Sequence, residues 1–258
     1  MTRRILLLGG TTEARKLAER LGHDARFETL MSLAGRTRSP KPTPVTVRVG
    51  GFGGVDGLID FLAQNPFDVV VDATHPFAVQ MSANAAKATA RTGIDLLRIE
   101  RAEWTPVAGD KWTSVACLEA ATNELAEMGQ RVFLGVGRQS LAPFANKPQH
   151  HYVIRVIDPP DIPAGMTHYE IITGLGPFRT QDDIELFRAK KIDVVVTKNS
   201  GGKATASKIA AARELALPVI MIERPKLEVG TQRVKVPSVD KAMAWLEAHY
   251  VSSTKRSV

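Results

Sequence analysis

Residues 5–14 read ILLLGGTTEA, and this strand-turn-helix pattern points to an α/β fold. Four consecutive apolar residues are typical of a parallel-sheet strand that is buried on both faces. Gly9 and Gly10 allow a tight turn, and Thr11 and Thr12 are suited to cap a helix. The pattern therefore predicts the first βα unit of a doubly wound domain, with a helix N-terminus that favours a phosphate.

The alternation of apolar runs and amphipathic segments continues along the rest of the chain, which predicts helices between the strands. Further buried strands are predicted at residues 27–33, 67–71, 95–99, 131–136 and 192–197. This rhythm predicts an α/β protein made of two Rossmann-like doubly wound parallel-sheet domains with a cleft between them. We place the domains at residues 1–130 and 131–258.

Two strand-to-helix segments, 115–125 and 236–246, have apolar residues at the same spacing. The matching residues are Val115, Leu118, Ala121 and Leu125 in one and Val236, Val239, Ala242 and Leu246 in the other. Amphipathic helices share this spacing by chance, so coincidence is the alternative. The similarity favours two related domains and leaves open an exchange of terminal elements between them.

The composition is that of a globular protein, with 44% hydrophobic and 24% charged residues among 258. The formal net charge of +7 favours anionic ligands. The sequence has no run of five or more Lys or Arg residues, which argues against a nucleic-acid partner. A single cysteine, Cys117, excludes an internal disulfide and argues against a cysteine zinc site, so no metal is expected. The N-terminal apolar run is too short for a signal peptide or a membrane span, so we expect a cytoplasmic protein without a membrane partner.

The candidate phosphate loop contains Gly9, Gly10, Thr11 and Thr12. It departs from the G-x-G-x-x-G fingerprint, and Glu13 lies close to the expected phosphate position, so a plain capped turn is the alternative.

The end of the second strand adds a preference between nicotinamide cofactors. The stretch Ala34-Gly35-Arg36-Thr37-Arg38 has arginines where NAD-dependent folds place an acid. Arg36 therefore indicates NADPH over NADH, with a solvated basic loop as the alternative.

A second polar loop follows the strand at 67–71, where residues 69–78 read VVVDATHPFA. Thr74 can donate a hydrogen bond, and His75 can bind an anion or transfer a proton, although it can equally cap or pack. Arg98 and Arg101 lie at the end of the next strand and are candidates to clamp carboxylates or to pair with nearby glutamates.

A similar loop follows the strand at 192–197, where residues 193–203 read DVVVTKNSGGK. The spacing is not that of a P-loop, which argues against an ATPase. Lys198 and the loop Asn199-Ser200-Gly201-Gly202 predict an anion site built from an ammonium group and backbone amides.

Five ordered motifs together resemble the precorrin-6A reductase family: LGGTTEA from residue 8, DATHPFA from 72, ERAEW from 100, GPF from 176 and TKNSGG from 197. The resemblance implies an NADPH-dependent oxidoreductase of cobalamin biosynthesis that reduces a double bond of precorrin-6A to give precorrin-6B. The substrate would be an acidic tetrapyrrole, in keeping with the basic charge, and the cofactor would supply the hydride.

The site hypothesis assigns each loop a role. We expect Gly9, Gly10, Thr11, Thr12 and Arg36 to hold NADPH and Thr74 to lie near the nicotinamide, with His75, Lys198 or water as the proton donor. The residues expected to bind the substrate are Arg98, Arg101, Asn199, Ser200, Gly201 and Gly202.

Some alternatives stay open. The loop at Gly9 and the loop at Lys198 could have the reverse assignment to NADPH and to the tetrapyrrole. A hand-over of the product to the next pathway enzyme is also left open. The alternative functions are a non-catalytic NADP(H)-binding sensor and another NADP-dependent oxidoreductase.

Overall fold

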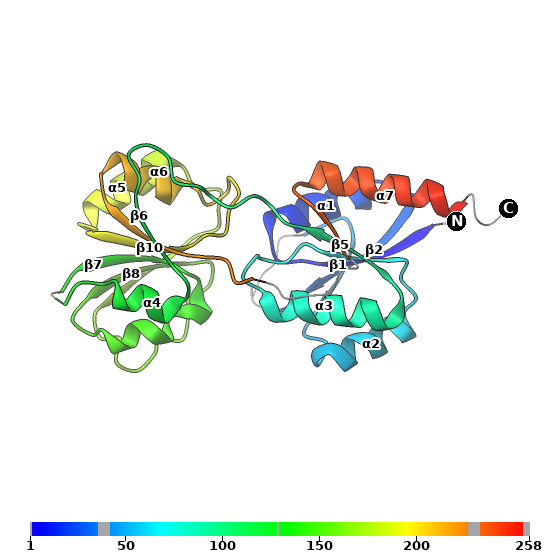
Figure 1. Ribbon diagram of the computed structural model, residues 1–258, viewed down its shortest axis with the longest axis horizontal. Helices are drawn as coiled ribbons and strands as arrows, with labels where there is room; N and C mark the ends of the chain where they lie inside the picture. The colour runs from blue at the N-terminus through cyan, green and yellow to red at the C-terminus, as the bar shows by residue number, and fades with distance from the viewer. Residues whose placement is uncertain (1, 36–41, 128, 227–232, 255–258) are drawn as a thin grey trace. The chain divides into compact units, whose positions relative to one another are not determined.

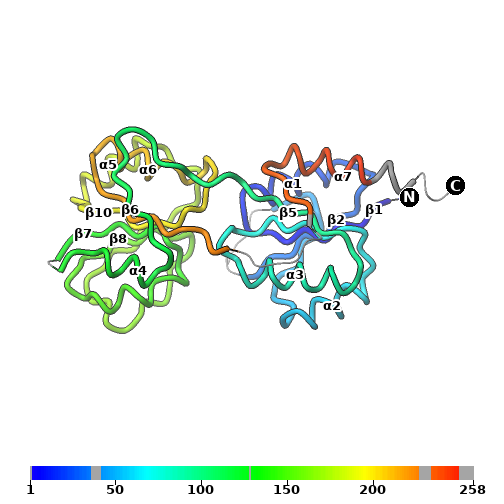
Figure 2. Tube along the Cα trace, viewed as in Figure 1, coloured from blue at the N-terminus to red at the C-terminus, as the bar shows by residue number. Residues whose placement is uncertain are grey.

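The structure, a computed structural model, describes residues 2–35, 42–127, 129–226 and 233–254 of the chain. Its contacts divide into two compact units. The first unit is Met1–Ala102 together with Lys226–Val258, and the second is the continuous segment Glu103–Pro225. Figures 1 and 2 show a parallel sheet with helices on both faces in each unit.

The first unit is built on a six-stranded parallel sheet in the order β12-β5-β4-β1-β2-β3. Its strands are β1 Arg3–Leu8, β2 Phe27–Leu33, β3 Thr46–Val49, β4 Val69–Asp72, β5 Asp95–Ile99 and β12 Arg233–Val236. Its helices are α1 Thr12–Gly22, α2 Gly54–Gln64, α3 Val79–Thr92 and α7 Val239–Thr254. Read from β3, this is the strand order of the Rossmann fold with β12 in the sixth position.

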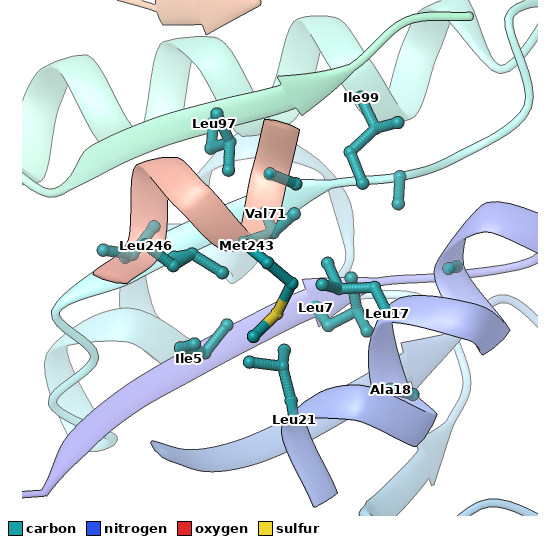
Figure 3. Packing of buried hydrophobic residues seen from close by; sticks show 14 of the residues in the cluster. Ile5, Leu7, Leu17, Ala18, Leu21, Val71, Leu97, Ile99, Met243 and Leu246 are labelled. Carbon is teal, nitrogen blue, oxygen red and sulfur yellow. The ribbon is translucent and has the colours of Figure 1, made fainter. Parts of the chain in front are cut away.

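The apolar run of β1 explains why this sheet is covered on both faces. Ile5 and Leu7 point to the face under α1 and α7, as Figure 3 shows, while Leu6 and Leu8 pack under α2 and α3. All four side chains are buried. Because neighbouring side chains of a strand point to opposite faces, a continuous apolar run fits only a central strand between two helical layers.

The second unit repeats this plan with the sheet order β6-β11-β10-β7-β8-β9. Its strands are β6 Lys111–Val115, β7 Arg131–Gly135, β8 His151–Val156, β9 Tyr169–Thr173, β10 Val194–Lys198 and β11 Pro218–Ile222. Its helices are α4 Leu118–Asn123, α5 Thr180–Ala189 and α6 Ser207–Glu214, with the 3₁₀ turns η1 Arg138–Ser140 and η2 Ala142–Asn146. Helices α5 and α6 cover one face and α4 the other (Figure 1).

The prediction of two Rossmann-like α/β domains is confirmed, but the expected boundary near residue 130 needs correction. Strand β6 pairs with β11, and β12 pairs with β5, so β6 and α4 belong to the second unit and β12 and α7 to the first. The sheets therefore show the exchange of terminal elements that the sequence left open. The similar segments 115–125 and 236–246 occupy equivalent places, each starting at the outer strand of a sheet.

A repeated tripeptide fixes how the two units correspond. Ile99-Glu100-Arg101 ends β5 and Ile222-Glu223-Arg224 ends β11. The Glu100 N–H donates to the Val236 carbonyl at 2.9 Å, and the Glu223 N–H donates to the Val115 carbonyl at 2.8 Å. The two sheets thus share one register, and the chain leaves each unit just after its arginine.

One buried histidine in the second unit lacks half of its hydrogen bonding. The His150 ring is fully buried, and its Nδ1 accepts the Gln130 N–H at 3.1 Å. Its Nε2 is a buried atom without a hydrogen-bond partner in the described part of the chain. Burial, followed by the charge of Lys147, lowers the pKa of His150 below its ordinary 6.5, because an imidazolium is costly to bury.

We expect stability to fall as the pH falls below about 6.5, because His150 then takes up a proton in the unfolded chain before it does so in the folded one. The loss of stability is expected in the pH range between the ordinary pKa of histidine and the lower pKa of His150 in the folded protein. Urea unfolding at a series of pH values from about 8 to 5 measures it. His150→Asn, which keeps an acceptor for the Gln130 N–H, should reduce the slope; an unchanged slope contradicts the assignment. His151, whose pKa burial also lowers, accounts for part of what remains.

Candidate active site

The turn between β1 and α1 leaves its backbone open. Gly10 has φ +112°, and a Cβ at this position would meet no heavy atom within 4 Å. The Thr11 Oγ1 accepts the Ala14 N–H at 3.1 Å and donates to the Ala73 carbonyl at 2.7 Å. Thr11 thus caps α1 and ties it to the loop after β4, while the first turn of α1, starting at Thr12, offers N–H groups that suit an anion.

The acidic residue in this turn is neutralised by a partner from β5's end. The Arg101 guanidinium donates to the Glu13 carboxylate at 2.5 Å, and both side chains are largely buried. This pairing offsets the repulsion that Glu13 would exert on a phosphate at the N-terminus of α1. In this structure Arg101 is paired at the β1–α1 turn, and its expected contact with a substrate carboxylate stays a prediction.

The loop after β4 is held by a buried ion pair. The Asp72 Oδ1 accepts the Thr74 N–H at 3.1 Å and the Thr74 hydroxyl at 2.7 Å. Arg98 donates to the Asp72 Oδ2 and to the Ser82 hydroxyl, and the Arg98 and Asp72 side chains are 2% and 1% exposed. Arg98 is thus paired inside the unit, where it fixes the carboxylate that positions Thr74, and its expected contact with a substrate carboxylate stays a prediction.

His75 has a defined tautomer. Its Nδ1 accepts the Phe77 N–H at 3.2 Å, so a neutral ring carries its proton on Nε2. The ring is half-buried. His75 can therefore offer an Nε2 proton to a ligand, which is the geometry that a hydrogen-bond donor or general acid requires.

In the second unit, the Lys198–Gly202 loop is held by Trp104. The Asn199 Oδ1 accepts the Trp104 N–H at 2.9 Å, and the Asn199 Nδ2 donates to the Trp104 carbonyl at 3.0 Å. The Trp104 indole donates to the Gly202 carbonyl at 2.9 Å. The Asn199 side chain is thus bonded to the Trp104 backbone, and its expected contact with substrate stays a prediction.

Arg224 fixes the middle of the same loop. Its Nε donates to the Asn199 carbonyl at 2.8 Å and its Nη2 to the Ser200 carbonyl at 3.0 Å. Ser200 and Gly201 are buried in this arrangement. The Lys198 ammonium is half-buried and donates to the Ser140 hydroxyl at 2.6 Å. Among the loop residues expected to bind anions, Lys198 is the one that brings a cationic side chain.

The sequence reasoning missed the loop after β7, whose residues are Gly135-Val136-Gly137-Arg138. Gly137 has φ +86°, and a Cβ there would meet no heavy atom within 4 Å. The available signal was a pair of glycines directly after a buried strand, as at Gly9 and Gly10. His75 and Lys198 belong to different units, and Arg36 lies outside the described residues.

In the part of the chain that the structure describes, no helix combines the length and the hydrophobicity that a membrane span requires. The same residues contain no group of three or more His, Cys, Asp or Glu side chains that could hold a metal ion.

Two Rossmann-type units, each with an open glycine turn after its first central strand, define a class of α/β proteins that bind phosphorylated or otherwise anionic ligands. The family model described as precorrin-6x reductase CbiJ/CobK matches residues 4–247. The chain therefore belongs to the precorrin-6x reductase family and is an oxidoreductase, as the motifs predicted.

Individual relatives agree with the family match. The chain is 52% identical to a precorrin-6A reductase of Sinorhizobium sp, over 96% of this chain and 94% of the relative. It is 47% identical to a precorrin-6A reductase of Rhodobacter capsulatus, over 99% of both chains. A solved structure, CobK precorrin-6A reductase, matches with a TM-score of 0.90 and 47% identity over 96% of this chain and 97% of that one. The fold of the whole chain is thus that of its family.

Proposed function

We propose that the protein reduces one double bond of precorrin-6A to give precorrin-6B, with NADPH as the hydride donor, in cobalamin biosynthesis. The observation that carries the proposal is the near-complete match to proteins named precorrin-6A reductase. The open turn at Gly10, with the α1 N-terminus behind it, supports a phosphorylated cofactor.

NADPH fits the first unit better than NADH. Gly10 and Thr12 would hold the diphosphate through backbone N–H groups, beside Gly9, whose own N–H donates to the Ser32 carbonyl at 2.9 Å. Thr11 keeps the turn in shape. The positive charge of Arg101 offsets the negative charge of Glu13 at this turn. Arg36 follows β2, the strand whose end contacts the adenosine ribose in Rossmann folds, and its cation suits a 2′-phosphate. When bound, the cofactor supplies the hydride.

The chain's own part in the reaction is to orient the reactants and to provide a proton. The Asp72–Arg98 pair fixes Thr74, and Thr74 leads directly into His75, so the imidazole sits on a rigid support near the proposed nicotinamide end. The His75 Nε2 proton and the Lys198 ammonium are the two candidate proton sources, with water as the third. We place the reaction in the cytoplasm. A hand-over of the product to the next enzyme of the pathway stays a prediction.

Anaerobic incubation of the purified protein with precorrin-6A and NADPH tests the proposal. We expect NADPH absorbance to fall together with a change in the tetrapyrrole spectrum, and mass spectrometry to find a product two hydrogens heavier. NADPH binding without any turnover would instead favour the non-catalytic sensor.

The cofactor preference has its own test. We expect Arg36→Ala to raise the KM for NADPH by about tenfold or more and to leave the KM for NADH nearly unchanged, because only NADPH carries the 2′-phosphate. Arg15→Ala, at an exposed position of α1, is the control. Equal weakening of both cofactors removes the proposed role of Arg36.

A further inference from the structure

The polar side chains buried under the loop after β4 form a closed ring of hydrogen bonds. Its members are Asp72, Thr74, Ser82 and Arg98, and none of these residues is more than 9% exposed. The Arg98 Nη1 donates to the Asp72 Oδ2 and to the Ser82 hydroxyl. The Thr74 hydroxyl lies 2.7 Å from the Asp72 Oδ1 and 3.3 Å from the Ser82 hydroxyl, which closes the ring.

This ring allows one order of protons. The Asp72 carboxylate can only accept, so the Thr74 hydroxyl gives its single proton to Asp72. The Ser82 hydroxyl accepts from Arg98, and its own proton therefore goes to the Thr74 oxygen. The Thr74 backbone N–H is also bound to Asp72, at 3.1 Å. The Thr74 hydroxyl, which we expected to be able to donate to a ligand, thus has no proton left for one.

The second sheet shows that the fold does not require such a ring. In the first sheet Asp72 pairs with Arg98, which precedes the Ile-Glu-Arg tripeptide. In the second sheet Thr197 pairs with Met221, which precedes the equivalent tripeptide. A neutral pair thus occupies the place of the buried ion pair. Since a buried ion pair often contributes no more than well-packed neutral side chains, stability alone does not account for Asp72 and Arg98.

The ring is joined to both ends of the proposed cofactor site. Ala73 lies between two ring members, and its carbonyl accepts the Thr11 hydroxyl at 2.7 Å. Thr11 caps α1 at the proposed diphosphate turn. On the other side, Thr74 continues into His75, whose Nδ1 accepts the Phe77 N–H at 3.2 Å. The diphosphate turn and the imidazole therefore share one support, which the buried ring holds in place.

We propose that Ser82 and Thr74 are positioning residues, which act through the ring to hold the His75 imidazole in one place and one tautomer relative to the cofactor. The inference rests on the proposed function, in which His75 is a candidate proton source. A displaced proton donor slows the chemical step, because the reacting atoms must be closely aligned. The ring should therefore affect kcat and leave the affinity for the cofactor unchanged.

Ser82→Ala and Thr74→Val in the full-length protein test the proposal, with Thr89→Val as the matched control. Thr89 is a buried threonine of α3, the helix that carries Ser82, and its hydroxyl donates to the Ala85 carbonyl at 2.8 Å. Activity is measured well below the unfolding midpoint of each variant. We expect both ring variants to lower kcat with precorrin-6A about 10- to 100-fold, with an unchanged Kd for NADPH. Thr74→Ser, which keeps the hydroxyl, should restore most of the activity, and Thr89→Val should retain it.

The tautomer of His75 is measured without the reaction. At a pH of about 8, where histidine is neutral, ring 15N chemical shifts distinguish the protonated from the unprotonated nitrogen. His75→Gln identifies the His75 resonances. We expect the Nε2-protonated form in the unaltered protein and a mixture of both tautomers in Ser82→Ala and Thr74→Val.

The two measurements separate this inference from the reaction itself. If precorrin-6A is not turned over but the His75 tautomer depends on the ring, the proposed reaction fails and the positioning of His75 stands. An unchanged tautomer in both ring variants would overturn the inference. So would weakened NADPH binding by these variants, or a loss of kcat in Thr89→Val equal to theirs.

Discussion

Arg98→Ala is expected to lower the free energy of unfolding by about 3–5 kcal/mol, because it leaves the Asp72 carboxylate buried without its cation. Both side chains are almost completely inaccessible to water, so neither solvent nor salt can compensate for the loss. The loop after β4 should loosen as well, since Asp72 holds the Thr74 hydroxyl and amide. Reductase activity should therefore fall even at temperatures where the variant is folded.

Urea unfolding measures this effect, and two variants control it. Arg91→Ala removes an exposed pair with Asp56 and should cost less than about 1 kcal/mol. The double variant Arg98→Met with Asp72→Asn removes both charges and keeps an acceptor for Thr74, so it should be more stable than Arg98→Ala alone. A cost for Arg98→Ala no larger than that for Arg91→Ala would contradict the buried pair.

The second large effect concerns fragments. A fragment of residues 103–225 is expected to fold alone with a cooperative unfolding transition, because it contains all six strands of the second sheet. A fragment of residues 131–258 lacks β6 and carries β12 and α7, whose partners lie in the first unit. It should not reach the same fold, since β11 would lose its outer neighbour and the apolar face of α7 would stay uncovered.

Circular dichroism and the dispersion of amide resonances distinguish the two fragments. The fragment of residues 1–102, which lacks β12 and α7, should gain structure when residues 226–258 are supplied as a separate peptide. If the 131–258 fragment unfolds as cooperatively as the 103–225 fragment, the sheet order of the second unit is wrong.

The elements of the fold were predictable from the sequence because they depend on local patterns. The apolar runs of β1 and β4, for example, can be recognised without knowledge of distant residues. The partners of β6 and β12 depend on long-range pairing, which hydrophobic periodicity does not encode, so the boundary near residue 130 was misplaced.

The site was predictable in part for a similar reason. A glycine turn after a strand can be recognised locally, and so the open turn at Gly10 was expected. Whether an arginine at a strand end faces a ligand or a buried carboxylate depends on its three-dimensional neighbours. The sequence therefore could not show that the Arg98 guanidinium pairs with the buried Asp72 carboxylate.

The insertion of the second unit between β5 and β12 has a consequence for synthesis on the ribosome. All residues of the second unit emerge before β12 and α7, although the first unit began first. Because domains generally fold as units during translation, the later-starting unit can finish while the earlier one still exposes the edge of β5. The last segment of the nascent chain, β12 and α7, then completes the unit that the first segment began.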